Sequence, residues 1–252
     1  MKLGFIGAGN MATALARGLG EPVLVADAAS DKAETLATEL GGSALRSNAE
    51  VAEQADVVVL CHKPAQLDAV APEVAPAGKP IVSILAVVTT AELEQRYPRV
   101  PVYRFIPNIP VEVRRGVLCY AGGSRAAEGP EQEILELMRR AGTVIPLDDE
   151  ALLEPAMALM SCGPAFVALI AESFVDAGSE HGLERAAAGL MVAETLAGTA
   201  EYLEARDLDT GALRARVATP GGVTERGLRT LEERGVPDGC RAAVDTVVKA
   251  TR

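Results

Sequence analysis

The stretch GFIGAGNMATAL, residues 4–15, decides the fold of this chain. It begins in a short apolar run that is typical of a buried strand and continues into a helical pattern. Gly7, Gly9 and Ala12 stand between the two in the spacing Gly-x-Gly-x-x-Ala, which is typical of a dinucleotide-binding turn. Gly7 makes the tight bend, Gly9 lets the backbone approach a pyrophosphate, and Ala12 lets the helix pack on the strand. The anion lies at the helix N-terminus, so the expected cofactor contacts here are Gly7, Gly9, Asn10, Met11 and Ala12.

An acidic residue follows at the end of the next strand-like run. Asp27 closes the run PVLVAD (22–27), where an acid would bind the adenosine ribose 2′-hydroxyl. Because a 2′-phosphate requires a basic side chain in reach, and none lies between Asp27 and Lys32, Asp27 favours NADH slightly over NADPH. Two alternatives stay open: the glycine turn could exist without a ligand, and Asp27 could only cap the following helix.

Apolar runs alternate with helical patterns over the first 148 residues, and after that the strand-like runs stop. Continuous apolar runs separated by helices predict a parallel sheet covered on both faces. We therefore predict an α/β fold with a Rossmann-like dinucleotide-binding domain, 1–148, followed by an all-α domain, 149–252. Besides the two strands above, the expected strands are 55–61, 79–85, 100–106, 116–121 and 143–147, with a helix at 130–141.

Composition excludes several classes of function. A net charge of −11 argues against nucleic-acid binding, which requires a basic surface. The four cysteines lie far apart without metal-ligand spacing, which predicts reduced thiols of a cytoplasmic protein and no metal site. The longest uncharged run, 155–171, is broken at Gly163-Pro164 and is short for a bilayer, and no targeting segment fits, so no membrane partner is expected.

Further motifs, taken in order and spacing, resemble the pyrroline-5-carboxylate reductase family. These enzymes reduce the cyclic imine Δ1-pyrroline-5-carboxylate to L-proline with NADH or NADPH, the last step of proline biosynthesis. The resemblance runs from Lys2 to about Val248 and is most specific in its last motif. Besides GFIGAGNMA, the motifs are HKPAQ (62–66), RFIPNIP (104–110), SCGPAFV (161–167) and TPGGVTERGLRTL (219–231).

The last motif raises a physical expectation of its own. Pro220-Gly221-Gly222 before a helix start is expected to present successive unpaired N–H groups, an anion-binding nest at a positive helix end. The resemblance implies that this loop binds the substrate carboxylate and that Thr224 bonds the ring nitrogen and relays its proton. A plain turn capped by Thr224 is the alternative. The expected substrate contacts are Cys162, Thr219, Gly221, Gly222, Val223 and Thr224.

The resemblance also assigns residues to the cofactor. Lys63 and Pro64 follow a strand, at the edge where open α/β sheets bind ligands, and the family has this Lys-Pro beside the cofactor. Lys63 is in addition a candidate catalytic residue, with a solvated surface lysine as the alternative. Asn48 is a further expected cofactor contact, and Asn108 is placed to orient the nicotinamide unless its role is structural.

Two departures from the family pattern bear on activity. Cys162 stands where the family has serine, and cysteine is a weaker hydrogen-bond donor. Ile106 stands where the family has methionine. These departures keep open a preference for a related cyclic imine, or a non-catalytic NAD(P)-binding regulatory descendant.

Imine reduction requires positioning more than acid–base groups, which suits a chain with two histidines. A β-hydroxyacid dehydrogenase would require a catalytic lysine in the helical half, and none lies between Leu147 and Glu201. The resemblance further implies that the helical domain joins two copies of the chain in a homodimer.

Overall fold

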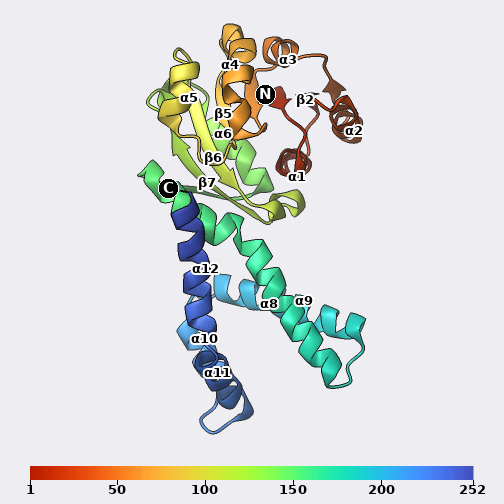
Figure 1. The fold of residues 1–252 in the computed structure, drawn as a ribbon, viewed down its shortest axis with the longest axis vertical. Helices are drawn as coiled ribbons and strands as arrows, with labels where there is room; N and C mark the ends of the chain where they lie inside the picture. The colour runs from red at the N-terminus through yellow and green to blue at the C-terminus, as the bar shows by residue number, and fades with distance from the viewer. Residues whose placement is uncertain (252) are drawn as a thin grey trace. The chain divides into compact units, whose positions relative to one another are not determined.

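The computed structural model describes residues 1–251 and contains an eight-stranded sheet in its N-terminal part (Figure 1). The strand order is β3-β2-β1-β4-β5-β6-β7-β8. Neighbours are parallel except β6 and β7, so β7 and β8 run opposite to the other six strands. The strands are β1 (Leu3–Ile6), β2 (Val23–Ala26), β3 (Ser43–Ala44), β4 (Val57–Leu60), β5 (Ile81–Ser83), β6 (Val102–Pro107), β7 (Gly116–Gly122) and β8 (Gly142–Pro146).

Six helices cover the two faces of this sheet. Three of them share one hydrophobic core with the sheet: α1 (Asn10–Leu19), α2 (Ser30–Leu40) and α6 (Glu131–Met138). The other three form a second core with the opposite face: α3 (Asn48–Gln54), α4 (Leu67–Val74) and α5 (Thr90–Arg96). Both faces are therefore covered, and the continuous Val, Ile and Leu runs of the strands follow from burial on two sides.

The connection from β1 to α1 is determined by close backbone contacts. Gly7 has a φ of 109°, and a Cβ there would lie 2.9 Å from the carbonyl of Cys61. At the other end of α1, a Cβ on Gly18 would lie 2.0 Å from the carbonyl oxygen of Val111. Neither position has room for a side chain, so α1 is held against neighbouring backbone at both ends.

The predicted α/β sheet is confirmed, with some differences in detail. The two-residue strand β3 was not predicted, because Ser43–Ala44 has no apolar run. The sequence also did not predict the reversed direction of β7; the short 3₁₀ turn Ile109–Val113 lets the chain turn back beside β6. Ser30 is the first residue of α2, and Ala29 is its N-cap residue.

The rest of the chain is helical, as predicted. The fold divides into two compact units, Met1–Pro164 and Ala165–Ala250, whereas the sequence places the division at 148/149, which stays a prediction. The first unit closes with α7 (Leu153–Ala156) and a π-helical turn, Met157–Ser161. The helices that follow are α8 (Gly163–Glu180), α9 (Arg185–Glu204), α10 (Thr210–Val217), α11 (Val223–Glu233) and α12 (Val236–Ala250).

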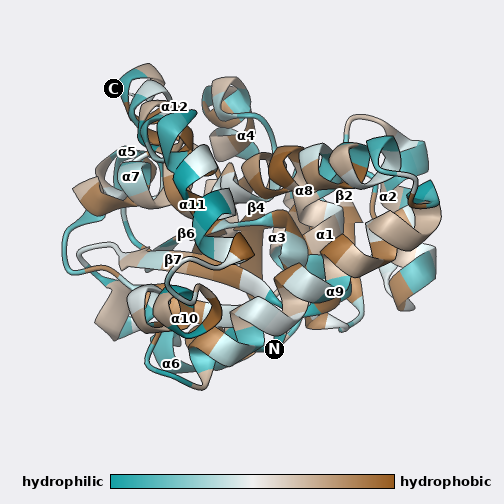
Figure 2. Cartoon of the chain, turned by 90° about the horizontal axis from the view of Figure 1, so that it is seen from below, coloured by the Kyte–Doolittle hydropathy of each residue, from teal (hydrophilic) through white to brown (hydrophobic). Residues whose placement is uncertain are grey.

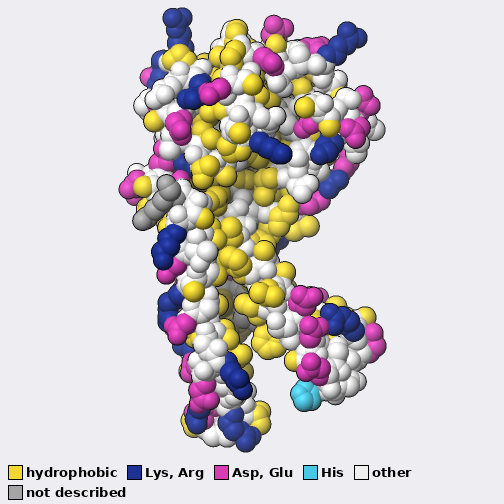
Figure 3. Space-filling view, viewed as in Figure 1, with side chains coloured by type: hydrophobic (Ala, Val, Ile, Leu, Met, Phe, Trp, Pro, Cys, Tyr) yellow, Lys and Arg dark blue, Asp and Glu magenta, His cyan; other side chains and the backbone are white. Residues whose placement is uncertain are grey.

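The helix α8 exposes apolar side chains that a folded chain normally covers. None of its residues is buried within the described chain, and Phe174 is 53% exposed. Figure 2 colours much of α8 as hydrophobic, and in Figure 3 hydrophobic side chains gather along it. The helical stretch Glu150–Glu180 is long and apolar enough to cross a bilayer, by length and composition alone. Only 6% of its most apolar window is buried within the described residues. A surface of this kind requires a partner.

Candidate active site

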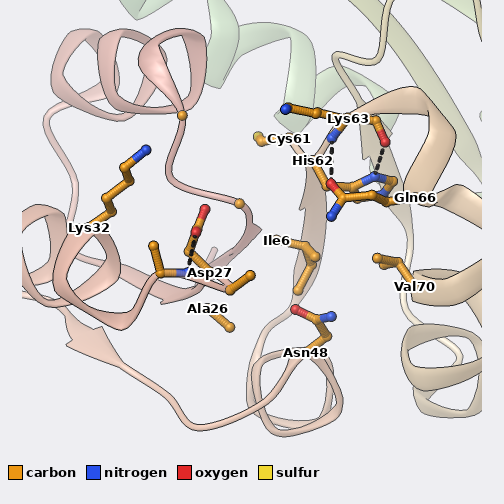
Figure 4. Close-up of a pocket in the computed structure, with 14 residues that line it drawn as sticks. Ile6, Ala26, Asp27, Lys32, Asn48, Cys61, His62, Lys63, Gln66 and Val70 are labelled. Carbon is orange, nitrogen blue, oxygen red and sulfur yellow. Dashed lines mark hydrogen bonds between the residues drawn. The ribbon is translucent and has the colours of Figure 1, made fainter.

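The largest group of predicted cofactor residues lines one cavity at the carboxyl ends of β1, β2 and β4. The chain continues from β1 to β2 on one side, while β4 pairs with β1 on the other, so this is the switch point where open α/β sheets bind ligands. The cavity has a volume of about 350 Å³. Its lining (Figure 4) is Ile6, Gly7, Gly9, Ala26, Asp27, Ala28, Ala29, Lys32, Asn48, Cys61, His62, Lys63, Gln66 and Val70.

The glycine turn leaves open space at the start of α1. No heavy atom lies within 4 Å of the position that a Cβ on Gly9 would occupy. Gly9 is also the N-cap of α1, and no side chain caps the helix. The first N–H groups of α1 therefore lack acceptors in the described chain, and they lie at the positive end of the helix. A pyrophosphate would satisfy them, so the residues present fit a dinucleotide.

Asp27 is braced by two backbone groups. The N–H of Ala8 donates to its Oδ2 at 2.7 Å, and the N–H of Ala29 donates to its Oδ1 at 2.8 Å. The second contact closes a local turn before α2, whose N-cap is Ala29 and has no side-chain capping bond, so Asp27 does not cap the helix. The first contact joins the acid to the glycine turn. Each carboxylate oxygen keeps a further lone pair, so the Asp27 carboxylate can still accept a hydroxyl hydrogen from a ribose in the cavity.

The opposite wall of the cavity comes from the segment after β4. Figure 4 shows Asp27 and Lys32 on one side and His62, Lys63 and Gln66 on the other. The N–H of Lys63 donates to Oε1 of Gln66 at 3.0 Å, which fixes the start of the short 3₁₀ turn Pro64–Gln66. The Lys63 side chain is exposed, so its ammonium is available to a bound ligand.

His62 is a neutral imidazole in this wall. Its Nδ1 lies 2.9 Å from the carbonyl oxygen of Lys63, so Nδ1 carries the hydrogen and Nε2 is a buried acceptor without a partner among residues 1–251. Burial lowers the pKa of His62 below its usual value, and the contact with the Lys63 carbonyl opposes this effect. Burial likewise raises the pKa of the neighbouring Cys61 thiol, which stays protonated and unreactive.

Several predicted cofactor residues lie outside this cavity. Asn10 lines a smaller neighbouring cavity of about 250 Å³ that lies beside the first and shares Lys32 with it. Met11 is partly buried against the core, and Ala12 is buried in it, consistent with helix-to-strand packing. Pro64 is exposed.

Asn48, by contrast, lines the cofactor cavity itself. Its Nδ2 donates to Oε2 of Glu73 in α4 at 2.8 Å. The side chain is therefore held in place from the adjacent helix, and its Oδ1 is left to accept a hydrogen bond from a ligand.

Asn108 lies at the end of β6 with both amide atoms bonded to backbone. Its Oδ1 accepts the N–H of Val117 at 2.8 Å, and its Nδ2 donates to the carbonyl oxygen of Met160 at 3.0 Å. Met160 belongs to the π-helical turn that precedes Cys162. These bonds support the structural alternative for Asn108, and contact with the nicotinamide stays a prediction.

A buried ion pair holds the start of the same segment. Arg104, which is 1% exposed in β6, lies 2.7 Å from Glu150 and 3.3 Å from Glu154. The segment before Cys162 is thus attached to β6 by charge at one end and by Asn108 at the other. Cys162 itself is a partly exposed free thiol.

The predicted substrate loop lies in the second unit, between α10 and α11. The expectation that its glycine N–H groups are unpaired is wrong: the N–H of Gly221 donates to Oε2 of Glu225 at 2.7 Å, and that of Gly222 donates to the carbonyl of Thr219 at 2.9 Å. Gly222 is the N-cap of α11 and has no side chain to bond the first turn. The groups that lack an acceptor within residues 1–251 are therefore the N–H groups of Val223, Thr224 and Glu225. The Thr224 hydroxyl likewise makes no hydrogen bond within these residues.

Among the cavity residues that were not predicted as cofactor contacts, three have side chains that can bond a polar ligand. Lys32, His62 and Gln66 each lie within a few residues of a predicted contact, and their position one helical turn beyond Asp27 or directly after β4 is the signal that could have found them. No cluster of metal-ligating side chains lies in the described residues.

The sheet, its switch point and the open helix start define a dinucleotide-binding protein. The family described as pyrroline-5-carboxylate reductase dimerisation matches residues 150–252, and the family described as NADP oxidoreductase, coenzyme F420-dependent, matches residues 2–87. The chain is 34% identical to a pyrroline-5-carboxylate reductase of Pseudomonas aeruginosa, over 93% of this chain and 89% of that protein.

Solved structures agree with this assignment. The pyrroline carboxylate reductase of Plasmodium falciparum with NADP bound superposes with a TM-score of 0.90 at 26% identity, over 100% of this chain and 97% of that one. The pyrroline-5-carboxylate reductase of Coxiella burnetii gives a TM-score of 0.88 at 28% identity, over 99% and 97% of the two chains. The chain belongs to the pyrroline-5-carboxylate reductase family.

Proposed function

We propose that this chain reduces Δ1-pyrroline-5-carboxylate to L-proline with a reduced nicotinamide dinucleotide, the last step of proline biosynthesis. One observation carries the proposal beyond family membership. The start of α11 offers three consecutive N–H groups without acceptors in the described chain, together with the free hydroxyl of Thr224. A small anion that also carries a ring nitrogen has the complementary chemistry: its carboxylate would accept the N–H groups and its nitrogen would bond the hydroxyl.

The chemistry asked of the protein is mainly positioning. The bound cofactor supplies hydride to the imine carbon, which is already electrophilic when the ring nitrogen is protonated. The N–H groups of Val223 and Thr224 would fix the carboxylate, and the Thr224 hydroxyl would hold the nitrogen and relay its proton. Cys162 and Thr219 are the further substrate contacts that we propose. Lys63 is exposed at the cofactor cavity, and its ammonium would bind the cofactor phosphates or take part in the reaction as a catalytic residue.

The relatives support a nicotinamide cofactor, and we propose a modest preference for NADH over NADPH. Asp27 places a carboxylate in the cavity where the adenosine ribose would bind, and this charge repels a 2′-phosphate. Lys32 lines the same cavity and opposes that effect. Because the two charges compete, both cofactors should be used, with the acid dominant since it is held by two backbone bonds.

The match to a dimerisation family supports self-association, and we propose a homodimer in the cytoplasm. The exposed apolar residues of α8 and α9 provide the surface: Val167, Leu169, Ile170, Phe174, Leu190 and Met191. A second copy of the chain would cover these side chains, and a protein interface rather than a bilayer would then account for the apolar surface of α8. All four cysteines are free thiols, which supports a reducing compartment.

The test is an assay of the purified chain. Loss of NADH or NADPH absorbance is followed with Δ1-pyrroline-5-carboxylate, and L-proline is identified by chromatography. A six-membered cyclic imine carboxylate serves as the competing substrate. Turnover of the five-membered ring with the higher kcat/KM supports the proposal. Preferential turnover of the six-membered ring, or cofactor binding without turnover of either ring, contradicts it.

A further inference from the structure

The loop that we assign to the substrate carboxylate is already held by a carboxylate of the chain itself. Oε2 of Glu225 accepts the N–H of Gly221 at 2.7 Å, four residues earlier. Glu225 lies in the first turn of α11, where the helix end stabilises a negative charge. The contact is therefore a charge-assisted hydrogen bond within the loop, of the stronger class.

This bond holds Gly221 in a left-handed backbone conformation. Gly221 has a φ of 74°, in the left-handed region, and no heavy atom lies within 4 Å of the position of a Cβ there. Packing does not hold Gly221, so hydrogen bonds must. The bond from Gly222 to the Thr219 carbonyl closes the turn on one side, and the bond from Gly221 to Glu225 closes it on the other. Together they set the direction in which the free N–H groups of Val223 and Thr224 point.

The same carboxylate also has an electrostatic effect. Glu225 places a negative charge one residue from Thr224, beside the helix end that would receive the substrate carboxylate. Two anions at one helix end repel each other. Glu225 thus acts on the loop in two ways that oppose each other, a favourable one through its acceptor atom and an unfavourable one through its charge.

We propose that Glu225 is a positioning residue of the substrate loop: its Oε2 holds Gly221 in the left-handed turn, and its charge limits the affinity for the substrate carboxylate. This inference rests on the proposed function, because it concerns the same loop. It assigns Glu225 no contact with the reacting atoms, so substitutions should change KM and leave kcat nearly constant.

Two variants separate the acceptor from the charge. Glu225→Gln keeps a carbonyl oxygen that can accept the Gly221 N–H and removes the charge; Glu225→Ala removes both. Comparison of the two variants therefore measures the effect of the hydrogen bond from Gly221 to Glu225, which we call the clamp. Comparison of Glu225→Gln with the wild type measures the effect of the negative charge. Glu233 is an exposed acid on the same helix with no hydrogen bond or ion pair in the described residues, so Glu233→Gln and Glu233→Ala are the matched controls.

We expect KM for the imine to be about fivefold higher in Glu225→Ala than in Glu225→Gln, the effect of one hydrogen bond. Relative to the wild type, Glu225→Gln should lower KM about two- to threefold, as expected for a partly screened surface charge. The control variants should match the wild type. Exchange of the Gly221 amide hydrogen, followed by NMR, should be slowed in the wild type and in Glu225→Gln and fast in Glu225→Ala.

Equal KM values and equal Gly221 exchange in the two Glu225 variants overturn the clamp. A KM in Glu225→Gln that is no lower than in the wild type overturns the charge effect, and a large common fall in kcat overturns the positioning role. If Glu225→Ala does not fold, Glu225→Met removes the carbonyl acceptor while keeping a good helix former. A wild-type chain without turnover contradicts the proposed function instead, and the exchange of Gly221 still tests the clamp.

Discussion

Asn108 and Met160 are joined by a hydrogen bond of 3.0 Å from the side-chain amide to the backbone carbonyl, which fastens the π-helical turn to the end of β6. The other amide atom of Asn108 accepts the N–H of Val117. One side chain thereby connects three segments of the first unit, just before Cys162. The segment before Cys162 is thus attached to the end of β6 by this amide and also by the Ser161 hydroxyl, which donates to the Pro107 carbonyl at 3.3 Å.

For Asn108 we therefore expect a loss of stability together with a loss of substrate affinity. Asn108→Ala leaves the part-buried N–H of Val117 and the part-buried carbonyl of Met160 without this partner, at a cost of about 2 kcal/mol in the free energy of unfolding. KM for the imine should rise more than KM for the cofactor. Denaturant unfolding and steady-state kinetics measure the two effects. A variant as stable as the wild type with impaired cofactor binding would instead support direct contact with the nicotinamide.

The glycine turn allows binding to be separated from folding. Gly9 has a φ of −74° and open space around it, so Gly9→Ala should fold with a melting temperature close to that of the wild type. Its methyl group would occupy the approach to the pyrophosphate, and we expect the Kd of the cofactor to rise about tenfold, or about 1.4 kcal/mol. Gly7→Ala is the contrasting variant: its positive φ and its contact with Cys61 predict a loss of about 2 kcal/mol or more in stability. Unchanged cofactor affinity in Gly9→Ala would argue against this binding mode.

Asp27 and Lys32 should shift cofactor preference in opposite directions. Asp27→Asn removes the charge that repels a 2′-phosphate, and the ratio of kcat/KM for NADPH over NADH should rise about fivefold, or about 1 kcal/mol. Since an amide NH₂ would then face a backbone N–H, we also expect a stability loss of about 1 kcal/mol. Lys32→Met should lower the same ratio. Parallel kinetics with both cofactors check the prediction, which fails if the two substitutions move the ratio in the same direction.

The hydroxyl of Thr224 can be tested by a conservative pair. Thr224→Ala removes the proposed partner of the ring nitrogen, and we expect kcat/KM for the imine to fall about 10- to 100-fold, the range for loss of one hydrogen bond to a charged group. Thr224→Ser keeps the hydroxyl and should retain most of the activity. Full turnover by Thr224→Ala would remove this residue from the mechanism.

His62 predicts a dependence of stability on pH. Burial lowers its pKa in the folded chain, so the unfolded chain binds the proton more readily. Folding therefore loses stability as the pH falls through the unfolded pKa of about 6.5, by up to about 1.4 kcal/mol per pH unit, and regains it above that value. His62→Gln should flatten the melting temperature between about pH 5.5 and 7.5, and His181→Gln serves as control. An identical pH profile in wild type and His62→Gln contradicts the prediction.

The first unit was predictable because its signals are local. The apolar runs, the spacing of Gly7, Gly9 and Ala12, and Asp27 at a strand end are each read within a few residues. Asp27 also shows the limit of such reading: the sequence indicates a ribose ligand or a helix cap, whereas its bond to Ala8 depends on how β1 and β2 pair. The carboxyl edge of a sheet collects residues from distant segments, and only the fold brings Lys63 to Asp27.

The helical half was predictable in class but not in the state of its loop. The sequence predicts free N–H groups at Pro220-Gly221-Gly222. In the structure the carboxylate of Glu225, in the first turn of α11, accepts the N–H of Gly221. Glu225 has no local pattern that separates it from a solvated acid. The free donors are displaced by two residues as a result, from the glycines to Val223 and Thr224.

The contact of Gly18 with the backbone of Val111 has a consequence at the other end of α1. A helix rises about 1.5 Å per residue, so Gly18 lies about 12 Å from Asn10 and touches no ligand site. Because α1 moves as one rigid helix, a side chain at position 18 would push its C-terminal end away from Val111 and so tilt its N-terminal end. The position of the glycine turn therefore depends on Gly18 near the far end of α1, and position 18 is as closed to larger amino acids as position 7.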